Sequence, residues 1–115
     1  MTDTVYKIVP DSIWRDAKAA GVFEGAEIDH RDGYIHFSTG AQARETARLH
    51  FSGVAGLMLV AVNVLALGEA LRFEPSRGGD LFPHLYGTLP LSAVLWEMPL
   101  LIGVDGQHAF PEKMP

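Results

Sequence analysis

The chain has 115 residues, of which 48% are hydrophobic and 20% are charged, and its formal net charge is −5. This length suits one domain over residues 1–115, and the apolar share is too high for a disordered chain. The acidic balance, without any basic run, argues against nucleic acid or an anionic membrane surface as a partner. The absence of cysteine excludes disulfides, thiolate chemistry and cysteine-type zinc sites.

The chain also lacks the sequence signals of a membrane protein. No segment approaches the roughly 20 continuous apolar residues of a membrane span. Residues 1–4 lack the basic and apolar regions of a signal peptide. We therefore expect a soluble cytoplasmic protein with no membrane partner. The oligomeric state stays open, with a monomer among the options.

Hydrophobic patterning predicts two strands and two helices in the first half of the chain. Residues 5–9 form a β-branched run whose odd and even positions face opposite ways. A helical pattern follows at residues 11–20. A second strand at residues 34–38 leads into a second helix that starts at Thr39, where T-x-x-Q matches a capping box.

The segment between the first helix and the second strand has no regular pattern. Residues 22–33 are mostly polar, so we expect a long loop that is either disordered or functional. Asp29, His30 and Asp32 could serve as metal ligands there. Solvated loop charges are the commoner explanation, and we assign no metal site.

The second half of the chain is rich in strands. Residues 57–64 are apolar almost throughout, as in a central strand covered on both faces. Further strands are expected at residues 71–75 and 94–102. The tail, residues 104–115, should be loosely held, which leaves a core at about residues 4–103. Helices early and strands late favour a single α+β domain with a mixed or mostly antiparallel split sheet and two main helices.

Polar side chains gather on the faces of the predicted strands. Three pairs of residues, each two positions apart, share a face: His36 with Ser38, Arg72 with Glu74, and His84 with Tyr86. If they converge, they form a cleft with acid–base groups, hydroxyls and a cation. The alternative for each is structural, namely a histidine bonded to backbone, a surface ion pair, or a core tyrosine with its hydroxyl at the rim.

Four segments together resemble one protein family. They are YKIVP at residues 6–10 with Trp14, GYIHFST at residues 33–39, LRFEP at residues 71–75 and LFPHLYGTLP at residues 81–90. Over about residues 4–100 the chain resembles the small bacterial family called domain of unknown function 952. The family has no established activity. The resemblance implies a fold similar to that of ADP-ribosyltransferases, in which a split, mixed β core holds NAD between two small sheets.

That likeness also implies roles for particular residues. The first strand would hold the ribose of the cofactor at Lys7, where the family usually carries histidine. Residues 37–39 resemble the second transferase motif, an aromatic and hydroxyl pattern before a helix. The third transferase motif supplies a glutamate, whereas residues 81–86 carry His84 and no carboxylate. Glu74 is the nearest acid upstream.

Two functions of different classes follow. In the first, the protein binds or acts on a nucleotide-like or phosphorylated small molecule, as a transferase or a glycosyl- or phosphoryl-processing enzyme. Its catalytic residues are His36, His84 and Glu74, and its substrate-binding residues are Lys7, Ser38, Arg72 and Tyr86. The sequence fixes no cofactor, and NAD or a related nucleotide would be the substrate. In the second, which the missing glutamate motivates, the same scaffold is a non-catalytic ligand-binding or regulatory module. A toxin–antitoxin or conjugate-processing role is a third option, by fold analogy alone.

Overall fold

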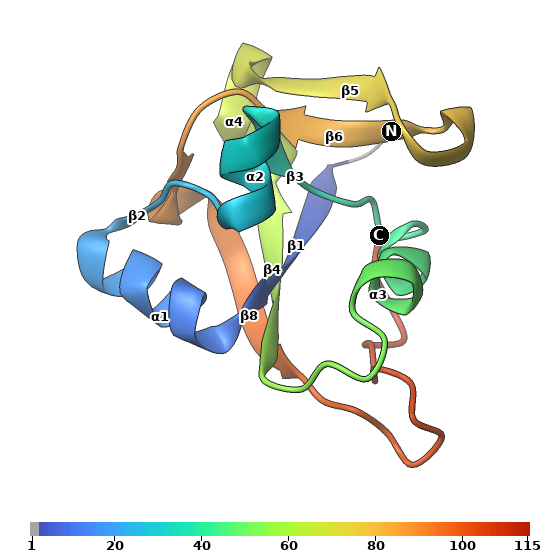
Figure 1. The fold of residues 1–115 in the computed structure, drawn as a ribbon. Coiled ribbons are helices and arrows are strands. Elements are labelled where there is room, and N and C mark those ends of the chain that lie inside the picture. Colours follow the sequence, from blue (N-terminus) through green and yellow to red (C-terminus); the bar gives the residue numbers. More distant parts are fainter. Residues whose placement is uncertain (1–2) are drawn as a thin grey trace.

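The computed structural model describes residues 3–115, in which helices and strands alternate before a final run of strands (Figure 1). The elements of the first part are β1 (Thr4–Pro10), α1 (Asp11–Ala20), β2 (Val22–Phe23), α2 (Glu27–Asp32), β3 (Ile35–His36), α3 (Ala43–His50), β4 (Leu57–Asn63) and α4 (Val64–Leu67). Those of the second part are η1 (Gly68–Ala70), β5 (Leu71–Pro75), η2 (Arg77–Gly79), β6 (Leu81–Leu85), β7 (Leu89–Pro90), η3 (Leu91–Ala93) and β8 (Val94–Leu100).

The strands form two small three-stranded sheets and one short pair. The sheet orders are β1-β4-β8, β3-β6-β5 and β2-β7. Every strand pairing in residues 3–115 is antiparallel. The α+β class with antiparallel sheets is therefore confirmed, and of the two expected alternatives, mixed or mostly antiparallel, the structure has the second. The reason is that α1 and α3 each connect strands of different sheets, so neither makes a parallel crossover.

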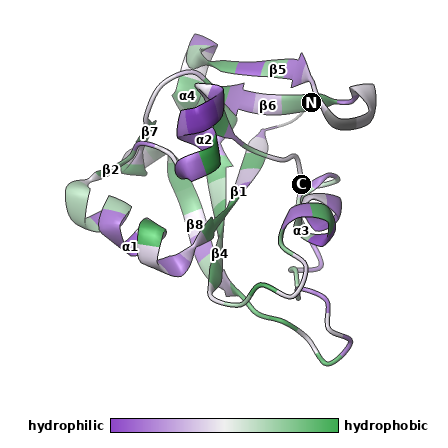
Figure 2. Cartoon of the chain, in the orientation of Figure 1, coloured by the Kyte–Doolittle hydropathy of each residue, from purple (hydrophilic) through white to green (hydrophobic). Residues whose placement is uncertain are grey.

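The β1-β4-β8 sheet carries apolar side chains on both faces. Val5 and Val9 of β1 belong to one buried cluster, and Tyr6 and Ile8 belong to the other. This split follows the alternation that the sequence predicts for a strand. The first face is covered by α1, the β2-β7 pair and the β3-β6-β5 sheet, and the second by α3 and the C-terminal segment. Figure 2 shows the result, with largely hydrophobic central strands and helices that carry both kinds of residue.

Helix α1 is fixed to the central sheet by its tryptophan. Trp14 is 1% exposed, and its indole N–H donates to the carboxylate of Glu97 on β8. Lys18 places its Nζ 2.6 Å from the same carboxylate. The helix ends at Gly21, whose φ of 86° is the left-handed conformation that glycine adopts without strain. These contacts hold α1 across the sheet from α3 (Figure 1).

The segment predicted as a long loop is largely ordered structure. Within residues 22–33 the chain forms β2 and the short helix α2. The helix ends at Gly33, which has a φ of 86° and donates its N–H to the carbonyl of Asp29. The carboxylate of Asp29 in turn accepts the N–H of Ala26 at 2.8 Å. The helix is formed because its own aspartate and glycine cap the two ends, a short-range signal that periodicity does not detect.

Helix α3 begins four residues later than the capping-box pattern predicts. The side chain of Gln42 accepts the N–H of Thr39 at 3.1 Å, so one half of the box is present. The hydroxyl of Thr39 makes no side-chain cap, and residues 39–42 form a turn before Ala43. Ser38 is held separately by its backbone, which pairs with that of Tyr6 on β1 at 2.7 and 2.9 Å. This bridge joins the two three-stranded sheets.

The C-terminal segment lies against α3 and the central sheet. Phe110 and Met114 pack on the second core cluster, and Arg44 of α3 donates to the carbonyl of Pro111 at 2.8 Å. A Cβ at Gly40 would lie 2.0 Å from the carbonyl oxygen of Met114, so only glycine permits this approach. Loose attachment of the tail stays a prediction. No helix in residues 3–115 is both long and apolar enough to cross a membrane.

Candidate functional site

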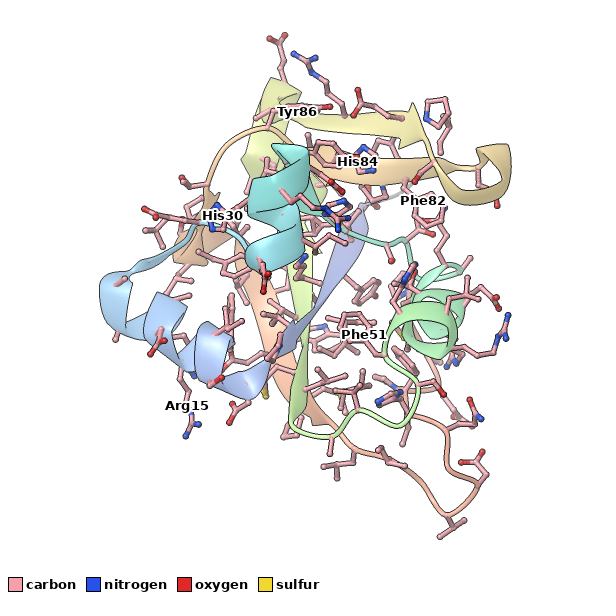
Figure 3. All side chains as sticks on the ribbon, viewed as in Figure 1. Arg15, His30, Phe51, Phe82, His84 and Tyr86 are labelled. Atoms are coloured by element: carbon pink, nitrogen blue, oxygen red, sulfur yellow. The ribbon has the colours of Figure 1, made fainter. Side chains whose placement is uncertain are left out.

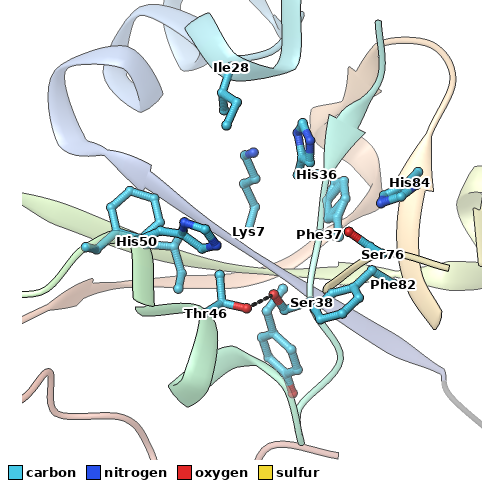
Figure 4. A pocket seen from close by; sticks show the side chains of 13 residues that line it. Lys7, Ile28, His36, Phe37, Ser38, Thr46, His50, Ser76, Phe82 and His84 are labelled. Atoms are coloured by element: carbon cyan, nitrogen blue, oxygen red, sulfur yellow. Dashed lines mark hydrogen bonds between the residues drawn. The ribbon is translucent and has the colours of Figure 1, made fainter. Parts of the chain in front are cut away.

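A pocket lies where β1, α2, β3, α3 and β6 meet (Figure 4). Its volume is about 340 Å³. The described residues that line it combine aromatic and aliphatic side chains with histidines and hydroxyls: Tyr6, Lys7, Ile8, Ile28, His36, Phe37, Ser38, Thr46, His50, Phe51, Ser76, Phe82 and His84. Because β1 is an edge strand that bridges to Ser38, the pocket sits at the junction of the two three-stranded sheets.

Lys7, which lines the pocket, belongs to a buried ion pair. The Nζ of Lys7 lies 3.0 Å from Oδ1 and 2.9 Å from Oδ2 of Asp29. Both residues are buried, with exposed fractions of 5% and 2%. Burial lowers the pKa of Lys7, and the charge and hydrogen bond of Asp29 act against that shift. The ammonium group is thus already neutralised by a protein carboxylate.

Asp29 also holds His36 in place. The carboxylate accepts the backbone N–H of His36 at 3.0 Å, and its Oδ1 lies 2.6 Å from Nδ1 of the ring. The other ring nitrogen, Nε2, lies 2.9 Å from Oδ2 of Asp32. Both nitrogens of His36 are therefore directed at carboxylates of α2, and the ring presents its remaining surface to the pocket.

The hydrogen bonds around Asp29 set its titration. Burial opposes ionisation, but the hydrogen bond from His36, the charge of Lys7 and the two backbone N–H groups outweigh it and hold the pKa well below its usual range. A carboxyl whose pKa is depressed by folding adds stability above its unfolded pKa of about 3.9. That stability is lost as the pH falls from there through the folded pKa.

We expect this pH dependence to disappear when Asp29 is replaced. The difference in free energy of unfolding between the wild type and the Asp29→Asn variant should shrink as the pH falls below about pH 4. Urea unfolding at several pH values measures it. A difference that does not change between about pH 4 and about pH 3 would show that these contacts do not lower the pKa of Asp29 on folding.

His84 is held by two residues that do not line the pocket. Its Nδ1 lies 2.9 Å from Oε1 of Glu74 on β5, and the hydroxyl of Tyr86 donates to the same oxygen at 2.7 Å. Figure 3 shows His84 on β6 and Tyr86 beyond the end of that strand. These two hydrogen bonds hold the pKa of Glu74 below its usual value, and the bond from Tyr86 has the larger effect. The carboxylate is then an acceptor only, so Nδ1 of the neutral ring carries the proton.

An aromatic residue also packs against the His84 ring. Tyr34 stacks on it, with ring centroids 4.1 Å apart and planes inclined by 29°. The imidazole itself is 3% exposed and lines the pocket. No described residue forms a hydrogen bond with its Nε2, which leaves that nitrogen available to a ligand.

The predicted site residues are brought together only in part. Four of them line the pocket: Lys7, His36, Ser38 and His84. Ser38 shares a hydrogen bond of 2.9 Å with the hydroxyl of Thr46 on α3. Glu74 contacts these four residues only through His84. Arg72 lies outside the pocket, with its guanidinium 4.8 Å from the ring centre of Tyr86.

The main residues that sequence reasoning missed are Asp29 and Tyr34. Asp29 has the role of a central buried acceptor rather than of a loop charge, and the helix stop at Gly33 was the signal that could have placed it on a helix. The alternation of the strand places Tyr34 on the same face as His36. It does not indicate that Tyr34 stacks on His84, which belongs to another strand. Among residues 3–115 no group of three histidine, aspartate or glutamate side chains is arranged to hold a metal ion.

The fold and site define a small α+β protein with antiparallel sheets and a pocket at their junction. The chain belongs to the protein family of unknown function DUF952, whose model matches residues 8–97. Its similarity to solved structures is high. The X-ray structure of protein CC0527 from Caulobacter crescentus is 48% identical, with a TM-score of 0.88 over 92% of this chain and 93% of that chain. The solution NMR structure of the same protein is 49% identical, with a TM-score of 0.82 over 90% of each chain.

These relatives carry no assigned function. They are structural genomics targets, and no curated protein matches the chain. The comparisons do not show a likeness to ADP-ribosyltransferases. Family membership therefore supports the fold and leaves the function to be argued from the site.

Proposed function

We propose that the pocket binds a nucleotide-like small molecule and that His84 exchanges a proton with it. The observation that carries the proposal is a pocket of about 340 Å³ in which one wall holds a buried, oriented imidazole with a free nitrogen. Ligand sites in proteins are usually concave and largely apolar, with a few fixed polar groups. Phe37, Phe51 and Phe82 supply aromatic surface of that kind.

The arrangement of Glu74 and His84 suits acid–base chemistry. A carboxylate that accepts from one ring nitrogen fixes the tautomer and leaves the other nitrogen to accept or return a proton. Tyr86 fixes the carboxylate in turn. In this proposal His84 is the catalytic residue and Glu74 is a positioning residue. His36 has a different role, because both of its nitrogens are already directed at Asp29 and Asp32.

An ADP-ribosyltransferase-like scaffold is the specific form of this proposal. Its support is a pocket at the junction of two small sheets, with Lys7 of β1 at its wall. The reaction class would be a transfer or a glycosyl- or phosphoryl-processing step on an NAD-like substrate. The glutamate of such enzymes has its nearest counterpart in Glu74, which acts here only through His84.

A non-catalytic binding module is the second candidate. It is favoured by the pairing of the charged groups around the pocket, since Lys7 and His36 are both bonded to Asp29. A pocket whose charges are already satisfied can hold a ligand without performing chemistry on it. Detection of a chemically changed product separates the two candidates.

The experiment is a thermal-shift screen against NAD, ADP-ribose and AMP. A ligand at 100 times its Kd adds about 2.7 kcal/mol, which should raise the Tm of a domain of this size by about 10 °C. The variant His50→Ala removes an exposed histidine of the pocket, and His30→Ala removes one that does not line it. We expect the shift to shrink only in His50→Ala. No shift in a folded sample, or an equal loss in both variants, counts against the proposal.

A further inference from the structure

We infer that the part of the ligand that enters the pocket is an uncharged, flat ring carrying an N–H donor, and that anionic groups stay outside. This inference rests on the proposed function and names the class of ligand. It follows from three features of the described residues: the balance of charge in the wall, the aromatic lining, and the hydrogen-bonding state of His84.

The cations of the pocket wall are matched by carboxylates. Lys7 and His36 together supply at most two positive charges, and they contact two carboxylates, those of Asp29 and Asp32. His84 supplies at most one positive charge and contacts Glu74. The wall that Lys7, His36 and His84 form thus has no surplus of positive charge even when both of its imidazoles are protonated, and His50, the third histidine of the lining, is exposed to solvent. A phosphate or carboxylate placed beside it would lose its hydration without gaining a counter-ion.

The shape of the lining favours a flat group. Phe37 and Phe82 are buried, with exposed fractions of 3% and 7%, and Phe51 faces the same pocket from the end of α3. Figure 4 shows Lys7 and His36 on one side of the space and Phe82 with Ser76 on another. A flat ring placed against aromatic neighbours is stabilised by ring–ring contacts as well as by the area that it buries.

The state of His84 selects a donor on that ring. With its proton on Nδ1 and directed at Glu74, the neutral imidazole offers Nε2 as an acceptor. An amino, amide or imino N–H of a heteroaromatic ring is the complementary group. A carboxylate in the same place would set an acceptor against an acceptor. Charge balance and hydrogen bonding therefore favour the same class of ligand, an uncharged ring with an N–H donor.

Matched pairs of ligands test this inference. Orotate is uracil with one added carboxylate. Nicotinate carries a carboxylate where nicotinamide carries an amide. We expect the uncharged member of each pair to bind at least about tenfold more tightly at pH 7, measured by calorimetry or NMR titration. In His84→Phe, which keeps a ring in place but removes Nε2, the uncharged members should lose most of that advantage.

A charge variant gives a second test. Asp32→Asn removes one carboxylate from the surface side of His36 and leaves the wall with surplus positive charge. The preference for the uncharged member should then narrow several-fold, while Asp16→Asn, on the exposed face of α1, should leave it unchanged. Anions that bind the wild type as tightly as their uncharged partners would overturn the inference while nucleotide binding stands. Failure of all these ligands and of the nucleotides to bind overturns the proposed function, and the inference with it.

Discussion

Replacing Asp29 by asparagine is expected to lower the free energy of unfolding by about 3–5 kcal/mol, because it leaves a buried ammonium group without a counter-ion. The carboxylate contacts Lys7, the backbone and ring of His36, and the N–H of Ala26. An amide of similar shape can keep some of these hydrogen bonds but cannot balance the charge. Urea unfolding at pH 7 measures the loss.

Two controls separate the buried charge from other effects. Asp32→Asn removes the exposed carboxylate on the other side of His36 and should cost far less. The double variant Lys7→Met/Asp29→Leu removes both charges and should recover a large part of the stability, since an apolar pair needs no counter-ion. A double variant no more stable than Asp29→Asn would mean that the hydrogen bonds to backbone, rather than the charge of Lys7, carry the effect.

The alternation of β1 could be predicted from the sequence because strand geometry is local. Val5 and Val9 are assigned to one face and Tyr6 and Ile8 to the other without any knowledge of the partner strands. The same argument correctly places the side chains of His84, on β6, and of Tyr86, just after that strand, on one side of the chain. Both contact Glu74, which lies on the neighbouring strand.

The partner of Lys7 could not be predicted because it depends on long-range packing. Asp29 is 22 residues away and reaches Lys7 only after α2 folds across the pocket. A polar segment with one buried carboxylate has the composition of a loop, so patterning favours solvent for every charge in it. The sequence likewise brings Arg72 to the correct strand but not to the correct place, since its guanidinium lies over Tyr86 rather than in the pocket.

The different roles of the two histidines also depend on partners that the sequence does not predict. His36 and His84 are paired across β3 and β6, and their rings lie 5.8 Å apart. The sequence treats them alike, whereas the carboxylates around them separate their roles. His36 has a carboxylate at each nitrogen, and His84 has one at Nδ1 only. The second arrangement leaves an atom free for chemistry.

The largest functional effect should therefore come from His84. For a ligand that is turned over, we expect His84→Phe to reduce kcat by 10²- to 10⁴-fold, the usual contribution of a positioned general acid or base. The phenyl ring can keep the stacking with Tyr34, so the protein should remain folded. Steady-state kinetics measures the effect, with circular dichroism as the test of folding.

Glu74→Gln makes the argument about roles testable. Glutamine can still accept from Tyr86 but carries no charge beside Nδ1 of His84. If Glu74 acts through His84, this variant should reduce kcat by a smaller factor than His84→Phe and leave the Kd of the ligand nearly unchanged. The double variant His84→Phe/Glu74→Gln should have the same kcat as His84→Phe alone, because the carboxylate has lost the residue through which it acts. Additive losses would contradict the dyad, and a wild type that releases its ligand unchanged would leave the binding module as the function of this pocket.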